Sequence, residues 1–254
     1  MKPILFLLLF GIACAQVSNN QRMTDRELDS FIGPVKKVFV EWSPISRSWS
    51  NIPIGTRCRD MTKVYDKSGR LTQYSVYPGS CGSDEIREDY TYNQDGSRTS
   101  KTQEIRDKNS PEPPPPIAGP PLNSEDMGQP RTFFKYDSKG RLIEEKSVRP
   151  SGKVISRNGF RYDARDRLIE IAGYDGRDQL SVRRVYDFTG EERVPTGFVY
   201  YGGNGKIYER TSYTEYEFNS RGDWIKRKET TEETFNRKSV SSIRREIEYY
   251  SPNK

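Results

Sequence analysis

Apolar and polar residues alternate imperfectly along most of this chain, and turn signals interrupt them at short intervals. From Arg131 to Tyr250, a turn recurs after roughly 10 to 14 residues, a spacing typical of short antiparallel strands. In Leu142–Val148 and in Lys206–Phe218, neither set of alternate residues is purely apolar. A sheet that is polar on both faces does not form a sandwich core. The pattern predicts an all-β antiparallel meander of tandem hairpins, in a twisted or curled, largely single-layer sheet.

One phrase recurs at the ends of the expected strands. It appears as Tyr65–Leu71, Tyr136–Leu142 and Tyr162–Leu168, and the first copy reads Tyr-Asp-Lys-Ser-Gly-Arg-Leu. Tyrosine suits the end of a half-buried strand. The aspartate carboxylate can accept hydrogen bonds from backbone amides ahead of it, which starts a turn, and glycine three residues later permits a left-handed conformation. We expect these turn-forming residues: Asp66, Gly69, Asp137, Gly140, Asp163, Asp166, Asp187 and Gly190.

Composition narrows the classes of chemistry. The chain has 254 residues, of which 32% are hydrophobic and 12% aromatic, with 16 tyrosines. This balance favours an ordered protein in which tyrosines supply much of the packing. Histidine is absent, which removes Ser-His-Asp and Cys-His sites and the commonest metal ligand. We therefore expect no cofactor and no metal. The net charge of +6 is spread among intermixed acidic and basic residues, which does not indicate a nucleic-acid partner.

The N-terminus indicates export. Lys2 precedes the apolar run Ile4–Phe10, and Ala13-Cys14-Ala15 has the small-x-small form of a cleavage site before Gln16. The apolar run is too short to cross a bilayer as a helix. The segment before Cys14 also resembles the lipobox of bacterial lipoproteins, with Gly11 in the place of the usual leucine. The sequence thus predicts a periplasmic or secreted protein, or one that is lipid-anchored to the outer membrane through Cys14, which is the only membrane contact that we expect.

Two further cysteines, Cys58 and Cys81, lie in the body of the chain. An even pair in an exported protein favours a disulfide, and two unpaired thiols are the alternative. A metal site is disfavoured because two cysteines without histidine make a poor tetrahedral shell.

The recurring Tyr-Asp-x-x-Gly-Arg-Leu phrases resemble the YD repeats of Rhs-type proteins. Tyr216–Arg227 is similar to a common C-terminal repeat of such chains, and Gly33–Val38 resembles the opening strand of short exported bacterial members. The resemblance implies an architecture of tandem YD-type hairpins and an uncharacterised function. Large members wind these repeats into a shell around a toxin domain, for which this chain is too short. A toxin-shell-related accessory protein is one hypothesis that follows.

A proline-rich stretch interrupts the repeats. Residues 107–130 hold eight of the 16 prolines, and proline cannot donate to a sheet ladder. We expect an exposed, extended loop there, either a solvated insertion or a docking peptide. The predicted segments are a signal peptide at 1–15, a leader at 16–32, N-terminal β repeats at 33–106, the proline-rich loop at 107–130 and a C-terminal β meander at 131–254.

Function is less constrained than fold. Carboxylate pairs such as Glu144 with Glu170, or Glu215 with Glu217, would suit a glycoside hydrolase, yet nothing separates them from solvent-facing strand charges. We therefore expect no enzyme. The leading hypothesis is a structural or binding role at the cell envelope or outside the cell, with an unknown protein, peptide or polysaccharide as partner. The candidate binding-face aromatics are Trp42, Trp49 and Trp224.

Overall fold

The structure is a computed structural model. It describes residues 31–46, 52–77, 81, 84–105, 128–234 and 237–251, and the described residues form strands and turns without any helix. The predicted signal peptide, Cys14, Trp49 and most of the proline-rich loop lie outside the described residues. In the described ranges, no helix is long and apolar enough to cross a membrane.

The described residues form fourteen strands. Their bounds are β1 Val35–Pro44, β2 Cys58–Tyr65, β3 Leu71–Val76, β4 Glu85–Tyr92, β5 Arg98–Ile105, β6 Arg131–Tyr136, β7 Leu142–Val148, β8 Val154–Tyr162, β9 Leu168–Asp175, β10 Leu180–Asp187, β11 Gly197–Gly202, β12 Ile207–Phe218, β13 Trp224–Glu233 and β14 Lys238–Tyr249.

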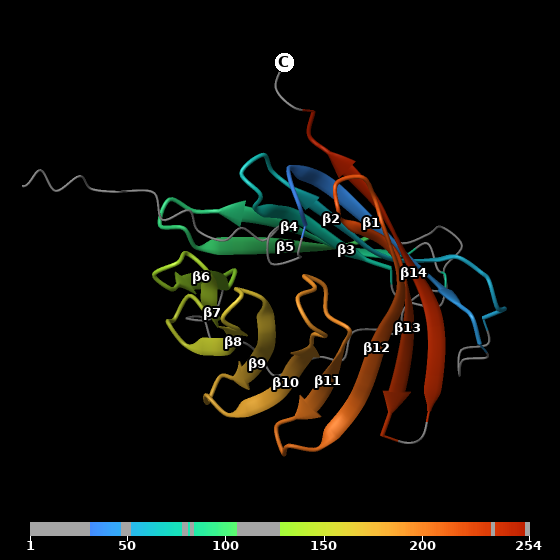
Figure 1. The fold of residues 1–254 in the computed structure, drawn as a ribbon. Coiled ribbons are helices and arrows are strands. Elements are labelled where there is room, and N and C mark those ends of the chain that lie inside the picture. Colours follow the sequence, from blue (N-terminus) through green and yellow to red (C-terminus); the bar gives the residue numbers. More distant parts are fainter. Residues whose placement is uncertain are drawn as a thin grey trace, which may run out of the picture.

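Each strand pairs with its neighbours in sequence, and the sheet closes on itself (Figure 1). The prediction of an all-β antiparallel meander is confirmed. The predicted twisted or curled, largely single-layer sheet is corrected to a closed barrel, because β1 pairs with β14 from Val35↔Tyr249 to Pro44↔Ser241. The ladder is shortest between β5 and β6, where only Arg98↔Thr132 and Thr99↔Arg131 are in register.

Five of the recurring turns lie at one end of the barrel. Asp66–Gly69, Asn93–Gly96, Asp137–Gly140, Asp163–Asp166 and Asn219–Gly222 each join an even-numbered strand to the next odd-numbered one. In each turn, the N–H of the last residue donates to the carbonyl of the first, at 3.0 or 3.1 Å. We call this end the aspartate rim. The phrase recurs after roughly two strands and two turns because the chain needs that length to return to the same rim.

Aspartate organises these turns through its backbone contacts. The Asp137 carboxylate accepts hydrogen bonds from the backbone N–H groups of Lys139 and Arg141, both at 2.9 Å. Gly140 closes the turn at φ 80°, and Asp166 takes the equivalent place at φ 63° in the next copy. Asp187 differs, since β10 and β11 are joined by the longer connection 188–196, which contains Gly190.

Neighbouring turns are also linked along the aspartate rim. The Arg141 guanidinium lies 4.8 Å from the Tyr162 ring centroid, and the Tyr162 hydroxyl donates to the Leu142 carbonyl at 2.9 Å. Both contacts recur at the preceding pair of hairpins. The Arg70 guanidinium lies 4.9 Å from the Tyr92 ring centroid, and the Tyr92 hydroxyl donates to the Leu71 carbonyl at 3.1 Å. The arginine, leucine and tyrosine of the phrase therefore join one hairpin to the next.

The Arg141→Ala variant is expected to lower the free energy of unfolding by about 1–2 kcal/mol, because it removes a cation–π contact and charge-assisted bonds to Asp137 and Asp166. The control is Arg161→Ala, since Arg161 is 67% exposed and pairs only with Glu170 among the described residues. Its expected cost is about 0.5 kcal/mol or less. Urea denaturation measures both. Equal costs would mean that the rim contacts contribute no more than an exposed ion pair.

The turn aspartates also predict a loss of stability in acid. Hydrogen bonds from the Ser97 hydroxyl and backbone lower the pKa of Asp95 to about 2, and backbone N–H groups of Gln179 and Arg177 lower the pKa of Asp175. A carboxylate with a depressed pKa stabilises the fold above its unfolded value of 3.8. That stability is lost as the pH falls through the folded value. The urea midpoint should therefore decline from pH 3.8 toward about 2. The urea midpoint of the Asp95→Asn variant should decline less steeply. An identical decline in both proteins would contradict a depressed pKa of Asp95.

One face of the sheet is buried and the other is charged. Val38 and Val40 on β1 lie in register with Ile247 and Arg245 on β14, and both valines are less than one-tenth exposed. Their neighbours on the opposite face include the exposed Lys37, Arg244 and Glu246. Since side chains alternate along a strand and the sheet is closed, the buried face is the inner one. The mixed strand faces noted in the sequence thus become an inner and an outer wall.

The segment before β1 closes part of the aspartate rim. Phe31 is 5% exposed and packs with Val35, Val38, Val40 and Tyr65. Its ring lies 6.2 Å from that of Tyr65, in an edge-to-face arrangement. The backbone N–H of Ile32 donates to the Asp223 carboxylate at 2.6 Å, which fixes this segment against the turn between β12 and β13.

Cys58 and Cys81 form a disulfide, as the sequence predicts. Cys58 begins β2 and is 1% exposed, and Cys81 lies in the connection between β3 and β4. The bond therefore ties the start of β2 to the connection between β3 and β4.

Candidate functional site

The inner wall of β10 to β14 gathers arginines among aromatic rings. We call this set the inner arginine–aromatic cluster. It consists of Arg184, Phe198, Tyr213, Trp224, Arg227 and Arg245, and each of the five strands supplies at least one member. Phe198, Tyr213 and Trp224 are each less than one-tenth exposed.

Rings and guanidinium groups alternate through this cluster. The Arg245 guanidinium lies 3.5 Å from the Trp224 ring centroid and 4.8 Å from that of Phe31. The Arg227 guanidinium lies 4.4 Å from Trp224 and 3.5 Å from Tyr213. A continuous stack therefore runs from the N-terminal segment across β14 and β13 to β12. Such contacts are strongest where the cation is removed from water.

The stack continues to β10. The rings of Tyr213 and Phe198 lie 6.1 Å apart, and the Arg184 guanidinium lies 4.7 Å from Phe198 and 5.8 Å from Tyr200. Burial raises the pKa of the Tyr213 hydroxyl.

Two bulges in β12 and β13 bring these rings to the inner wall. The register between the strands shifts between Thr214 and Glu217, where Glu215 has φ 54°, and again before Phe218↔Trp224. A bulge re-aims the side chains beside it. Tyr216 consequently lies edge-to-face with both Tyr213 and Trp224, at 6.5 and 6.1 Å.

Acidic side chains also lie near the cluster arginines. Glu229 accepts a hydrogen bond from Arg227 Nη2 at 3.0 Å, and Glu209 accepts one from the Thr211 hydroxyl at 2.8 Å. Burial, and then the charge of Glu229, raise the pKa of Asp60 on β2. The Nε atoms of Arg184 and Arg227 are buried and meet no acceptor among the described residues. Buried donors without an acceptor are costly, which marks this wall as a place for a ligand oxygen.

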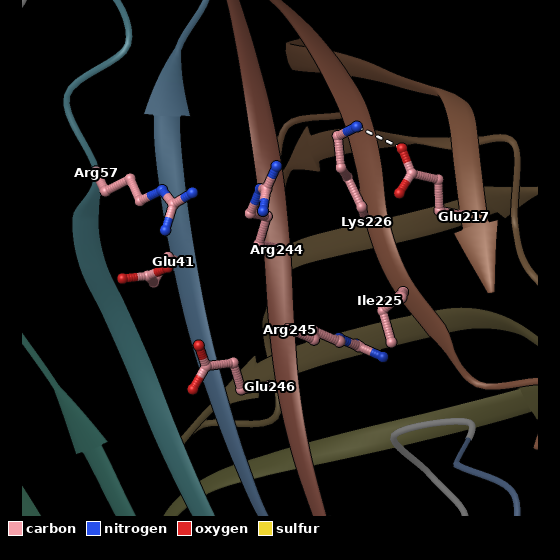
Figure 2. A pocket seen from close by; sticks show the side chains of 8 residues that line it. All are labelled: Glu41, Arg57, Glu217, Ile225, Lys226, Arg244, Arg245 and Glu246. Carbon is pink, nitrogen blue, oxygen red and sulfur yellow. Dashed lines mark hydrogen bonds and ion pairs between the residues drawn. The ribbon is translucent and has the colours of Figure 1, made fainter. Parts of the chain in front are cut away.

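The outer wall offers a different surface (Figure 2). A hollow of about 130 Å³ is lined by Glu41, Arg57, Glu217, Ile225, Lys226, Arg244, Arg245 and Glu246. Strand register places Glu41 beside Arg244, Arg244 beside Lys226, and Lys226 beside Glu217, to which Lys226 is ion-paired. Three glutamates and four basic residues line this hollow, so it mixes both signs of charge. We therefore take the inner cluster as the candidate site.

The candidate carboxylate pairs do not form an acidic site. Glu170 pairs with Arg161 at 3.2 Å and Glu215 with Lys228 at 2.9 Å. Glu217 pairs with Lys226, and Glu144 lies 3.8 Å from Arg157. Each carboxylate thus faces a basic side chain on a neighbouring strand, as solvated strand charges do. Among the described residues, no group of three or more His, Cys, Asp or Glu side chains is placed to hold a metal ion.

The structure does not bring the candidate tryptophans together. Trp224 is 5% exposed and central to the inner cluster, whereas Trp42 is half-buried on β1, in register with Ile243 and Cys58. No ring contact joins the two within the described part of the chain. The sequence does not single out the three cluster arginines. Two of them belong to the pairs Arg183-Arg184 and Arg244-Arg245, in which the sequence does not show which member faces inward.

Comparison with known proteins identifies no family. No protein-family model matches the chain, and no curated protein matches it. Among solved structures, a porin-like protein from Bacteroides uniformis has 12% identity and a TM-score of 0.44, with 86% of this chain and 99% of that chain covered. A domain described as outer membrane lipoprotein-sorting, from Vibrio parahaemolyticus, has 9% identity and a TM-score of 0.35, with coverages of 90% and 91%.

A DUF1329 family protein from Desulfovibrio piger has 9% identity and a TM-score of 0.29, with 90% of each chain covered. Likenesses at this level carry no argument about what the chain does. The identification as a YD-repeat family member is wrong, because no family model matches the chain and its fourteen described strands close into one barrel in which each strand pairs with its neighbours in sequence. The recurring phrase instead reflects hairpin turns at one rim of a barrel.

Proposed function

We propose that this protein is an exported, non-catalytic binding barrel that takes an amphipathic ligand against the inner arginine–aromatic cluster. The observation that carries the proposal is the buried stack of cations and rings on β10 to β14. Rings offer contact area to an apolar body, and guanidinium groups offer donors to a polar end.

Two features support a place outside the cytoplasm. The N-terminal sequence predicts a signal peptide, and the Cys58–Cys81 disulfide favours an oxidising compartment. Whether Cys14 carries a lipid remains a separate proposal, which mass spectrometry of the mature N-terminus would decide.

The charged residues of the outer wall support the proposal that water, and not lipid, surrounds the barrel. Lys146 and Arg157 face each other on β7 and β8, and Arg244 and Lys226 do so on β14 and β13. A lipid-facing wall carries an apolar band, where each Arg or Lys at the bilayer midplane costs about 2–4 kcal/mol. This arrangement favours a ligand carrier or receptor exposed to solvent over a wall buried in lipid.

The test uses N-phenyl-1-naphthylamine, a neutral apolar dye that fluoresces when it leaves water. The variant Trp42→Phe/Trp49→Phe keeps Trp224 as its only tryptophan, so energy transfer from Trp224 reports dye beside the cluster. We expect saturable binding with about one dye per chain. The Phe198→Ala substitution should weaken it roughly tenfold, because a buried ring is lost from the site.

Phe133→Ala is the matched control, since Phe133 neighbours the inner-facing Phe134 on β6 and therefore lies on the outer wall. Its dye affinity should equal that of the parent. Absence of saturable transfer in a folded protein, as judged by circular dichroism, would overturn the proposed function.

A further inference from the structure

Among the described residues, the inner wall holds four arginines in aromatic surroundings, and they differ in their counter-ions. They are Arg98, Arg184, Arg227 and Arg245. Arg98 on β5 lies between the rings of Tyr90 and Phe134, at 4.4 and 5.1 Å, and is ion-paired with Glu145 at 2.9 Å. Arg227 is ion-paired with Glu229 at 3.0 Å. An arginine in such surroundings is ordinarily compensated in this way, because an unpaired buried charge is costly.

Arg184 lacks this compensation. Its guanidinium lies over Phe198 and Tyr200, and no carboxylate of the described residues forms an ion pair with it. The Tyr186 hydroxyl is its side-chain hydrogen-bond partner, and Glu209 acts on it only electrostatically. Its Nε atom is buried without an acceptor. The inner wall therefore holds a guanidinium with ring contacts in place and the counter-ion missing.

Another buried donor without an acceptor, Arg227 Nε, belongs to the same cluster and is linked to Arg184 through two rings. Tyr213 packs against Phe198, which Arg184 covers, and the Arg227 guanidinium lies 3.5 Å from the Tyr213 ring centroid. Glu229 engages Arg227 through Nη2, and Arg227 Nε is left unpaired. Arg184 on β10 and Arg227 on β13 both interact electrostatically with the Tyr213 hydroxyl.

We infer that the ligand carries an anionic head group, a carboxylate or a phosphate, that is held by Arg184 with support from Arg227. This inference rests on the proposed function and specifies the chemical class of its ligand. A charged oxygen satisfies the unpaired guanidinium, and charge-assisted bonds are stronger than neutral ones. The apolar body of the ligand then lies along the rings of the cluster, from Phe198 toward Trp224.

Three probes with the same twelve-carbon chain test the inference: dodecanoic acid, dodecyl phosphate and the neutral monododecanoylglycerol. Each displaces N-phenyl-1-naphthylamine from the Trp224-only protein. We expect the two anions to bind at least about tenfold more tightly than the glyceride, and the order of acid and phosphate identifies the head group. Raised salt should weaken the binding of the two anionic probes and leave the binding of the glyceride unchanged.

The variants place the effect on one side chain. Arg184→Gln keeps a long polar side chain and removes the charge. It should therefore abolish the preference for anions without lowering the affinity for the glyceride. Arg183→Gln is the matched control, because Arg183 is the adjacent residue of β10, faces the outer wall and lies 4.6 Å from the Tyr201 ring centroid. Its preference for anions should equal that of the parent.

The outcomes separate the two proposals. If all three probes bind alike, or if Arg184→Gln keeps the preference for anions, the head-group inference is wrong and the binding barrel stands. Dye binding without displacement by either anion also overturns the inference. If neither the dye nor any twelve-carbon probe binds to the folded protein, the proposed function itself fails.

Discussion

Replacing Trp224 with alanine is expected to lower the free energy of unfolding by about 3–5 kcal/mol, the cost of removing a large buried ring and leaving a cavity. Trp224 is 5% exposed and lies between Arg245 and Arg227, at 3.5 and 4.4 Å. Its loss leaves two guanidinium groups facing an empty space in place of a ring. Urea denaturation followed by far-ultraviolet circular dichroism measures the change.

Phe218→Ala is the control for this variant. Phe218 lies opposite Trp224 in the ladder between β12 and β13, and it is 49% exposed. Removing a half-exposed ring should cost about 1 kcal/mol or less. If both variants lost the same stability, Trp224 would not be the packing centre that the structure shows. A small loss in Trp224→Ala alone would mean that the inner wall collapses readily to fill the cavity.

Removing the disulfide is expected to cost about 3 kcal/mol, because the bond restricts the unfolded chain across the 23 positions that separate Cys58 from Cys81. The loop encloses β2 and β3, so its loss should loosen the first hairpin of the aspartate rim. The Cys58→Ser/Cys81→Ser double variant should show the lower urea midpoint with little change in its secondary structure.

Dithiothreitol provides the matched control for the disulfide. It should move the parent protein to the midpoint of the double variant and leave the double variant unchanged. A parent midpoint that is unaffected by complete reduction, verified by thiol titration, would contradict a stabilising role for this bond.

Local chemistry accounts for what could be predicted about the fold. Aspartate followed by glycine three residues later directs a tight turn through contacts within five residues, as Asp137 and its bonds to Lys139 and Arg141 show. Alternating strands and such turns suffice to predict antiparallel hairpins. The same chemistry explains the mistaken family assignment, since hairpins joined by this turn repeat the phrase whether or not the chain belongs to a YD-repeat family.

The candidate site was less accessible to prediction. Arg183 and Arg184 are identical in sequence terms, and only the register of β10 with β9 and β11 sends the second one inward. A bulge at Glu215 turns Tyr216 to the same wall as Tyr213, which simple alternation does not predict. The carboxylate pairs that the sequence suggested are instead divided among neighbouring basic residues.

The sequence by itself determined the all-β class, the antiparallel hairpin order and the disulfide, because each depends on residues near one another in the chain or on a single pair of cysteines. The tertiary structure alone decided that the sheet closes, since Val38 meets Ile247 across almost the whole chain. Closure divides every strand into an inner and an outer wall. It thereby gathers arginines and rings from five strands into one cluster, and a pattern read along one strand does not contain that information.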